Sequence, residues 1–419
     1  MKKVALRLKI FSALRPLPFA FCLLLLFGCA PLLEKPLAPK PPVRPPQALV
    51  PVSPQDIPPL KDDLDQVSLE QAVFRSLQYF ERLSGKRTYR FGDKRYTVKE
   101  MKDSLVLFLR IMKSDDPPGV KEKRIRESFD FYKASGRKEG GKVIFTGYYE
   151  PVLEGSFEET EIFRYPVYGI PDDMVTVHLG KFRSKFRGER IVGRVANGEV
   201  IPYYNRRDID AEGALEKKGH EIAWLPDPVD VFFLHIQGSG MIRFPEGGFM
   251  QISFAGSNGR PYRGLGRMMV DSGKITEKEM SLRSIKKYLR EHPDEMTDIL
   301  SYNESYVFFR IVEEGPVGSI GVPLTGGRSI ATDLDIFPRG ALSFIRLRKP
   351  LFDPEGEITS WTGFSRFALN QDTGGVIKGP ARVDLFCGRG TKAERSAGSL
   401  KEEGELFFLV QKKGGKATP

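Results

Sequence analysis

The chain has 419 residues, of which 40% are hydrophobic and 28% are charged, and its formal net charge is +11. This composition predicts a soluble globular body that is long enough for two domains. Removing residues 1–28 takes away five positive charges and no negative ones, which leaves 11 − 5 = +6. That charge suits an anionic partner such as a carboxylate-bearing polymer, and it does not require nucleic acid.

The N-terminal segment 1–28 has the pattern of a signal peptide. Five basic residues precede the apolar run 17–27, which is too short to span a bilayer. Residues 26–29, Leu-Phe-Gly-Cys, resemble a bacterial lipobox, in which Cys29 receives lipid after cleavage before it. The two residues after Cys29 lack the aspartate that often retains lipoproteins in the inner membrane. We therefore expect a lipid anchor at the periplasmic face of the outer membrane, with ordinary secretion as the alternative.

Residues 29–66 follow as the expected lipid-anchored linker. Prolines are dense up to residue 59, and this composition favours an extended, semi-rigid tether. Once Cys22 is removed and Cys29 is acylated, Cys387 is the remaining cysteine, so no intramolecular disulfide can form.

Helical signals come next. Capping boxes at 68–71 and 97–100 precede apolar residues at three- and four-residue steps, and 121–134 is a third predicted helix. From residue 143 the pattern changes to short strands separated by Gly and Pro, which is typical of an all-β unit of barrel type. The predicted strands are 143–150, 165–168, 174–179, 191–195, 229–236, 241–244 and 249–254. Helices are predicted at 276–289 and 293–300, and strands return from 306.

The most informative stretch is 367–390, where two short apolar runs flank a Gly-rich connection. Asp372 and Asp384 lie near the joints of this predicted strand, loop and strand. Each aspartate could simply cap a turn. However, the glycines allow backbone to approach a ligand, and Lys378 and Arg382 offer cationic donors. A carboxyl group held there could do acid/base work.

This stretch resembles the C-terminal signature of the membrane-bound lytic murein transglycosylase A family, Asp-x-Gly-Gly-x-Ile-Lys-Gly followed by an Asp-bearing strand. The resemblance continues in five further blocks in the same order. They are 145–151 (Phe-Thr-Gly-Tyr-Tyr-Glu-Pro), 236–244, 254–262, 303–309 and 322–333 (Val-Pro-Leu-Thr-Gly-Gly-Arg-Ser-Ile-Ala-Thr-Asp). Six ordered blocks over roughly residues 70 to 410 are far more specific than any single motif.

The resemblance implies a mainly β fold with flanking helices: a double-psi β-barrel domain, a second, inserted β-barrel-like domain, and a groove between them. Carried over to this chain, the catalytic barrel domain with its N-terminal helices covers 67–152 and 287–415. The inserted β domain covers 153–286.

The family's reaction cleaves the β-1,4 bond between N-acetylmuramic acid and N-acetylglucosamine without water and leaves a 1,6-anhydro end. The sugar's own C6 hydroxyl is then the nucleophile, so one carboxyl group can serve first as acid and then as base. By motif position this group is Asp384, kept protonated by a partly dry groove. Asp372 and Asp333 complete the three-aspartate signature by ordering the loop or polarising Asp384.

Further residues could contact substrate in the groove, where hydroxyls and amides suit sugars and N-acetyl groups, and for each a structural role is the alternative. They are Thr146, Tyr148, Tyr149, Gln237, Ser239, Tyr262 and Lys378. Glu150 could be a second carboxyl group, but a lone Glu before Pro at a strand end is more often solvated. The expected partners are peptidoglycan glycan strands and, through the anchor, a membrane; complexes for cell-wall synthesis or hydrolysis are further candidates.

Rival chemistries find little support. The segment 327–331 resembles a nucleophile elbow around Ser329, yet the last histidine, His292, precedes it, which excludes that type of hydrolase. The four histidines are too far apart for a helical metal pair and have no cysteine partners, so we expect no metal and no cofactor. Residues 388–393 fit a dinucleotide fingerprint only loosely and are interpreted as a turn. Two alternatives stay open: a non-catalytic peptidoglycan-binding lipoprotein and a hydrolytic muramidase.

Overall fold

The structure is a computed structural model that describes residues 47–137 and 141–414. The expected signal peptide, the lipidation site at Cys29 and the first part of the linker lie outside the described residues. In the part that is described, no helix is both long enough and apolar enough to cross a membrane.

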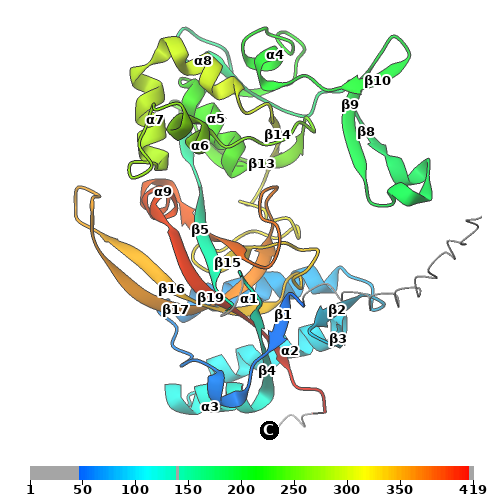
Figure 1. Cartoon of the computed structure of the whole chain (residues 1–419), viewed down its shortest axis with the longest axis vertical. Coiled ribbons are helices and arrows are strands. Elements are labelled where there is room, and N and C mark those ends of the chain that lie inside the picture. Colours follow the sequence, from blue (N-terminus) through cyan, green and yellow to red (C-terminus); the bar gives the residue numbers. More distant parts are fainter. Residues whose placement is uncertain (1–46, 138–140, 415–419) are drawn as a thin grey trace, which may run out of the picture. The chain divides into compact units, whose positions relative to one another are not determined.

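Six strands close into a barrel near the middle of the described chain (Figure 1). In hydrogen-bonded order they are β19 (Lys401–Gln411), β16 (Leu342–Phe352), β17 (Ile358–Asp372), β15 (Ser329–Ala331), β18 (Arg382–Arg389) and β5 (Val143–Glu150). The ring is closed because β5 pairs again with β19. Two more strands, β4 (Phe129–Ala134) and β1 (Leu49–Pro51), continue the sheet from β19.

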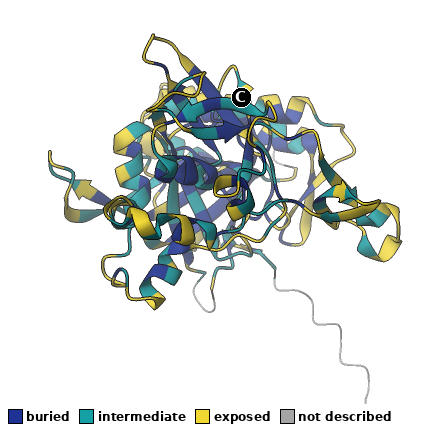
Figure 2. Ribbon diagram, turned by 90° about the horizontal axis from the view of Figure 1, so that it is seen from above, coloured by how far each residue is buried: buried dark blue, intermediate teal, exposed yellow. Residues whose placement is uncertain are grey.

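The barrel strands form where apolar and β-branched residues can be buried on both faces. In β17 every residue from 366 to 371 is buried, because one face packs into the barrel and the other meets a helix. That helix is α1 (Gln66–Glu81), whose Ala72 carbonyl accepts a hydrogen bond of 2.8 Å from Gln371 Nε2. Buried residues, dark blue in Figure 2, gather at the centre of the ribbon. The β17 strand is thereby fixed up to Asp372, its last residue.

The described chain before β4 is mostly helical. It contains α1, α2 (Val98–Lys113) and α3 (Pro118–Ser128), the hairpin of β2 (Thr88–Phe91) and β3 (Lys94–Thr97), and a single turn, η1 (Pro54–Asp56). The capping box at Thr97 and Glu100 is confirmed. The box predicted at 68–71 is wrong, since α1 begins three residues earlier, at Gln66, and its cap Asp65 accepts the hydrogen bond from Ser68 N. The predicted helix 121–134 ends at Ser128, and β4 takes its last residues.

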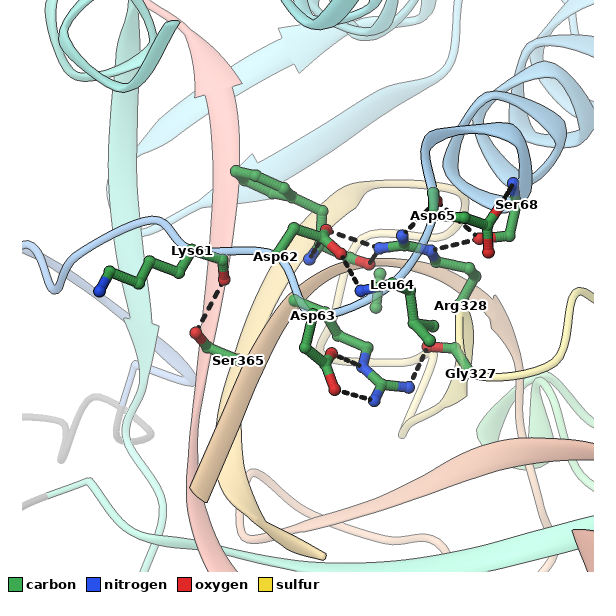
Figure 3. A network of polar contacts seen from close by, with 12 residues as sticks. Lys61, Asp62, Asp63, Leu64, Asp65, Ser68, Gly327, Arg328 and Ser365 are labelled. Atoms are coloured by element: carbon green, nitrogen blue, oxygen red, sulfur yellow. Dashed lines mark hydrogen bonds and ion pairs between the residues drawn. The ribbon is translucent and has the colours of Figure 1, made fainter. Parts of the chain in front are cut away.

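A buried arginine fastens the start of α1 to the barrel (Figure 3). Arg328 is fully buried and donates to Asp62 Oδ2 at 2.6 Å, to the Asp65 carbonyl at 2.8 Å and to Ser68 Oγ at 3.1 Å. Beside it, both carboxylate oxygens of Asp63 accept hydrogen bonds from the Arg366 guanidinium. Bidentate pairs of this kind combine energy with a fixed geometry. The entry to β15 is therefore held from outside the barrel.

The segment between β5 and β15 carries separate sheets and helices. A four-stranded sheet has the order β14 (Val307–Val312), β13 (Phe249–Ser257), β12 (Ser239–Arg243) and β6 (Val152–Glu154). A two-stranded sheet pairs β11 (Glu221–Leu225) with β7 (Tyr165–Tyr168). A three-stranded sheet has the order β10 (Glu199–Pro202), β9 (Arg190–Ala196) and β8 (Met174–His178). The helices are α4 (Arg206–Asp210), α5 (Pro228–Gln237), α6 (Leu265–Asp271), α7 (Leu282–Glu291) and α8 (Pro293–Ser301). The prediction of a mainly β fold with flanking helices is confirmed.

Two predictions fail in instructive ways. The run 229–236 is helix α5 and not a strand: Asp227 caps it, Pro228 occupies its first turn, and Gly238 ends it at φ 76°. Residues 388–393 are not simply a turn, because helix α9 (Gly390–Ser399) begins inside them. The predicted domain boundary at 286 stays a prediction; β14, which lies beyond it, pairs with β13.

Candidate active site

The short strand β15 brings two of the three signature aspartates together. Ala331, its last residue, is the register partner of Asp372 on β17 and of Asp384 on β18. The next strand of the ring is β5, where Thr146 is paired with Asp384 and Tyr148 with Phe386. Residues that are about 240 positions apart in the chain thus meet at one place on the barrel wall.

Asp384 is a mostly buried carboxyl group with one hydroxyl and one cation beside it. Its side chain is 17% exposed, and it accepts a hydrogen bond from the Thr146 hydroxyl. The Arg382 Nε lies 3.6 Å from Asp384 Oδ1, too far for a good hydrogen bond. Burial raises the pKa of Asp384 above its ordinary value, and this outweighs the hydrogen bond from Thr146 and the charge of Arg382, which favour the ionised form. Asp384 is thus ion-paired with Arg382 at 3.6 Å, yet burial keeps its pKa above the ordinary value.

Asp372 is held by two donors from different segments. Tyr148 Oη donates to Asp372 Oδ2 at 2.9 Å, and the backbone N–H of Ser319 donates to Oδ1 at the same distance. Burial raises the pKa of Asp372 and, together with the adjacent carboxylate, that of Tyr148. Tyr148 also feels the charge of Asp384. It therefore links the two aspartates electrostatically.

Asp333, the third aspartate, organises a loop. Its Oδ2 accepts a hydrogen bond of 2.8 Å from the Gly379 N–H, and Gly379 has φ 76°. Lys378 Nζ lies 4.0 Å from Asp333 and 3.8 Å from Asp335, with 64% of its side chain exposed. Asp333 thus ties the segment after β15 to the connection between β17 and β18, and Lys378 lies at the surface of that loop.

The remaining residues predicted to contact substrate fall into two groups. Tyr149 is buried: its N–H donates to Gln237 Oε1 at 3.1 Å, and its hydroxyl donates to Glu394 at 2.9 Å. Gln237 is the last residue of α5, so the hydrogen bond from the Tyr149 N–H joins β5 to that helix, while the buried Ser239 begins β12 and pairs with Ser253 on β13. Tyr262 keeps 45% of its surface exposed, and the burial of the remainder raises its pKa, which the charge of Arg382 opposes. Tyr262 therefore lies within electrostatic reach of Arg382.

Sequence reasoning missed the role of Glu150, and the interpretation of this residue as solvated is wrong. Glu150 is fully buried at the end of β5, where Arg389 Nε and Gln251 Nε2 both donate to its carboxylate. Burial raises the pKa of Glu150, with the Arg389 charge acting against it. The signal in the sequence that could have indicated a buried Glu150 is its position before Pro151, where β5 of the barrel ends and the inserted segment begins.

The Ser329 hydroxyl and the Cys387 thiol, two other groups near the site, are not in a reactive state. Ser329 is fully buried, donates to Gln371 Oε1 at 2.6 Å and accepts from the Thr325 N–H, so it is no nucleophile. Burial raises the pKa of Cys387 to about 12, which keeps its thiol protonated. Over residues 47–137 and 141–414, no three His, Cys, Asp or Glu side chains are placed to hold a metal ion.

Two family models match the chain, and together they define its class. Residues 144–310 match the MltA specific insert domain, and residues 328–410 match the 3D domain. Membrane-bound lytic murein transglycosylase A of Vibrio cholerae is 30% identical over 305 residues, which are 71% of this chain and 73% of the relative. The protein of the same name from Escherichia coli K12 is 30% identical over 283 residues, 67% of this chain and 69% of the relative.

Solved structures agree. A membrane-bound lytic murein transglycosylase from Agrobacterium tumefaciens superposes with a TM-score of 0.71 at 30% identity and covers 87% of this chain and 98% of that one. Escherichia coli MltA with bound chitohexaose superposes with a TM-score of 0.65 at 25% identity and covers 87% of this chain and 95% of that one. The class is thus a lytic murein transglycosylase with an inserted domain and a C-terminal 3D domain. The chain belongs to the membrane-bound lytic murein transglycosylase A family.

Proposed function

We propose that the chain cleaves the β-1,4 bond between N-acetylmuramic acid and N-acetylglucosamine in peptidoglycan and leaves 1,6-anhydro-N-acetylmuramic acid ends, with Asp384 as the single acid and base. The observation that carries this proposal is Asp384 itself, a carboxyl group with a raised pKa that is still partly exposed. A group that is neutral before the reaction can donate a proton to the leaving oxygen.

The proposed reaction uses one carboxyl group twice, first to donate a proton and then to accept another. Asp384 protonates the glycosidic oxygen as the bond from the muramoyl C1 to that oxygen breaks, and N-acetylglucosamine leaves with a free 4-hydroxyl. The resulting carboxylate then removes the proton from the muramoyl C6 hydroxyl, whose oxygen bonds to C1. Asp384 ends protonated, as it began. The Thr146 hydroxyl stabilises the intermediate carboxylate, and Arg382, whose Nε is buried without a hydrogen-bond partner among the described residues, adds positive charge beside it.

Glu150 is poorly placed to activate water for attack beside Asp384. Glu150 lies four residues beyond Thr146 on β5, about 13 Å along an extended strand, and it is neutralised by Arg389. A hydrolytic glycosidase of the inverting kind places its carboxyl groups about 6.5–9.5 Å apart. Glu150 is therefore not the second carboxyl group of an inverting muramidase, and product analysis decides between the two reactions.

The substrate contacts remain part of the proposal. Because the Escherichia coli relative was crystallised with chitohexaose, we propose that this chain also binds a glycan strand beside Asp384. Tyr262 and Lys378 are the exposed candidates for contacts with it. In this proposal Thr146 and Tyr148 act through the aspartates, Tyr149 and Gln237 join β5 to α5, and Ser239 is part of the β12–β13 pairing.

Product analysis tests the reaction. Purified sacculi are incubated with the wild-type chain and with Asp384→Asn, and the released fragments are examined by mass spectrometry. We expect anhydro-muropeptides from the wild type and none from the variant. Anhydro products from Asp384→Asn at the wild-type rate would remove Asp384 from the mechanism. Reducing ends would identify a muramidase, and sedimentation with sacculi without any release would identify a binding protein.

We also propose that Cys29 is acylated and that the protein is anchored to the periplasmic face of the outer membrane. The relatives are named membrane-bound, and no described helix could span a bilayer. Fractionation of membranes from cells that express the wild type or Cys29→Ser tests this. We expect the wild type in the outer-membrane fraction and the variant in the soluble periplasm.

A further inference from the structure

A small sheet in the inserted segment carries an unusual surface. Strands β8, β9 and β10 pair with one another only, and the connection between β8 and β9 contains two single turns, η2 (Leu179–Lys181) and η3 (Ser184–Phe186). We call residues 174–202 the basic arm. It is drawn at the right of Figure 1, and the same segment in Figure 2 is mostly yellow, the colour of exposed residues.

One face of the basic arm is packed and the other is open. Met174 and Val192 point to the packed face, against a core cluster that contains Tyr203 and Tyr306. Side chains alternate along a strand, so Ile191 and Val195 on β9 share the opposite face. Their cross-strand partners are apolar as well: Val195 pairs with Val200 on β10, and Ile191 pairs with Val177 on β8. Ile191, Val195 and Val200 are all exposed, and Val195 reaches 61%.

The tip of the basic arm is strongly cationic. Residues 179–190 contain five Lys or Arg side chains and one carboxylate, and all six are exposed: Lys181, Arg183, Lys185, Arg187, Arg190 and Glu189. In the part of the chain that the structure describes, none of these cations lies within 4.0 Å of a carboxylate. Phe182, in the middle of this run, is 75% exposed. An exposed aromatic ring thus stands among cations whose charges are not neutralised nearby.

We propose that the basic arm docks on an anionic lipid surface, so that the enzyme has a second membrane contact besides its N-terminal anchor. Lys and Arg side chains are attracted to anionic head groups, and an exposed Phe ring can insert at the boundary between the head groups and the acyl chains. The open valine and isoleucine face would gain hydrophobic contact there. An anionic lipid layer offers negative charge to the cations of the arm and an apolar interior to its open aliphatic face.

Other occupants fit less well. A second copy of the chain would bring its own five cations against the first five, which costs energy at ordinary salt. A glycan strand is recognised by hydroxyl and amide groups, whereas the open face of the arm is aliphatic. A single lipid anchor leaves the orientation of the enzyme free, and a second contact on the inserted segment would fix it.

Vesicle binding tests the proposal in the secreted chain with Cys29→Ser, which carries no acyl group. We expect it to co-sediment with vesicles of phosphatidylglycerol and phosphatidylcholine in equal parts at low salt, and not with phosphatidylcholine alone. Lys181→Gln, Arg183→Gln and Lys185→Gln together should weaken binding about a hundredfold, since each cation near an anionic surface contributes about a fivefold factor. Phe182→Ser should weaken binding even at salt concentrations that screen the cations.

A matched control removes three exposed cations elsewhere: Lys86→Gln, Arg110→Gln and Lys278→Gln. This control should bind vesicles within a few-fold of the parent, and both triple variants should degrade sacculi like the parent, which shows that they are folded. Equal loss of binding in both triple variants would mean that only net charge matters and would overturn the proposal. Loss of binding to sacculi with unchanged vesicle binding would assign the arm to the polymer, and a change in oligomeric state would assign it to a second copy.

Discussion

The Thr146 hydroxyl donates a hydrogen bond to Asp384, its register partner on the neighbouring parallel strand. Strands β5 and β18, which are far apart in sequence, therefore together set the proton affinity of the Asp384 carboxyl group. Burial pushes the pKa of Asp384 up, and the hydrogen bond pulls it back toward its ordinary value. This balance leaves a carboxyl group that can give up a proton and then take one back.

Thr146→Val should lower activity and move the pH profile. Loss of a hydrogen bond to a charged group costs about 1.5 kcal/mol, which is about tenfold in rate. The same loss raises the pKa of Asp384, so the decline in activity as Asp384 ionises moves to higher pH. The measurement is kcat/KM on solubilised glycan strands across pH.

Thr146→Ser is the control for that prediction, because it keeps the hydroxyl and removes only a methyl group. It should retain both the rate and the pH profile of the wild type. If Thr146→Val slowed the reaction without moving the pH profile, Thr146 would be a packing residue and not a partner of the acid.

Asp384→Asn should make the folded protein more stable at neutral pH. A buried carboxyl group whose folded-state pKa is raised contributes stability that is fully present below its unfolded pKa and is lost as pH rises through the folded pKa. The asparagine cannot ionise and avoids this loss. Urea unfolding should therefore show an advantage for the variant that grows as pH rises from acidic to neutral. Equal advantages at both pH values would mean that ionisation of Asp384 does not oppose folding.

The sequence was sufficient to find the aspartates but not to assign their work. The Asp-x-Gly-Gly segment and the later Asp-bearing strand pointed to Asp372 and Asp384, and the structure pairs both with Ala331. What no local pattern contains is the pairing of Thr146 with Asp384 from across the barrel. That contact depends on the ring of strands closing through β5, which is a property of the whole fold.

Local signals also decided where helix and strand were confused. The run 229–236 is rich in valine and phenylalanine, which suggested a strand, but Asp227, Pro228 and Gly238 supply the start and stop signals of helix α5. The capping residues outweighed the apolar run because they satisfy backbone groups that a strand would pair elsewhere. The buried ion pair of Glu150 with Arg389 escaped because the two residues lie 239 positions apart.

Asp62→Ala should destabilise the protein strongly. The Asp62 carboxylate accepts from the buried Arg328 and from the Phe367 N–H at 2.9 Å, so its removal leaves an uncompensated charge inside. Such losses cost about 3–5 kcal/mol. Asp65→Ala is the matched control, because Arg328 hydrogen-bonds to the backbone carbonyl of Asp65 and not to its side chain. This variant loses only the helix cap, which costs about 1 kcal/mol. Urea unfolding measures both, and equal effects would contradict the role given to Arg328.

Glu150 offers the sharpest separation between structure and catalysis. Glu150→Ala should lower the unfolding free energy by about 1–2 kcal/mol, because Arg389 and Gln251 would lose their acceptor, while the 39% exposed Arg389 side chain can still be solvated. Glu150→Gln keeps the shape and should cost less. If Asp384 is the acid and base, as proposed, the folded fraction of both variants should still form anhydro-muropeptides with a wild-type pH profile. A Glu150→Gln protein that folds like the wild type yet releases no product would make Glu150 a second catalytic carboxyl group, and the single-acid mechanism would have to be replaced by one that uses two.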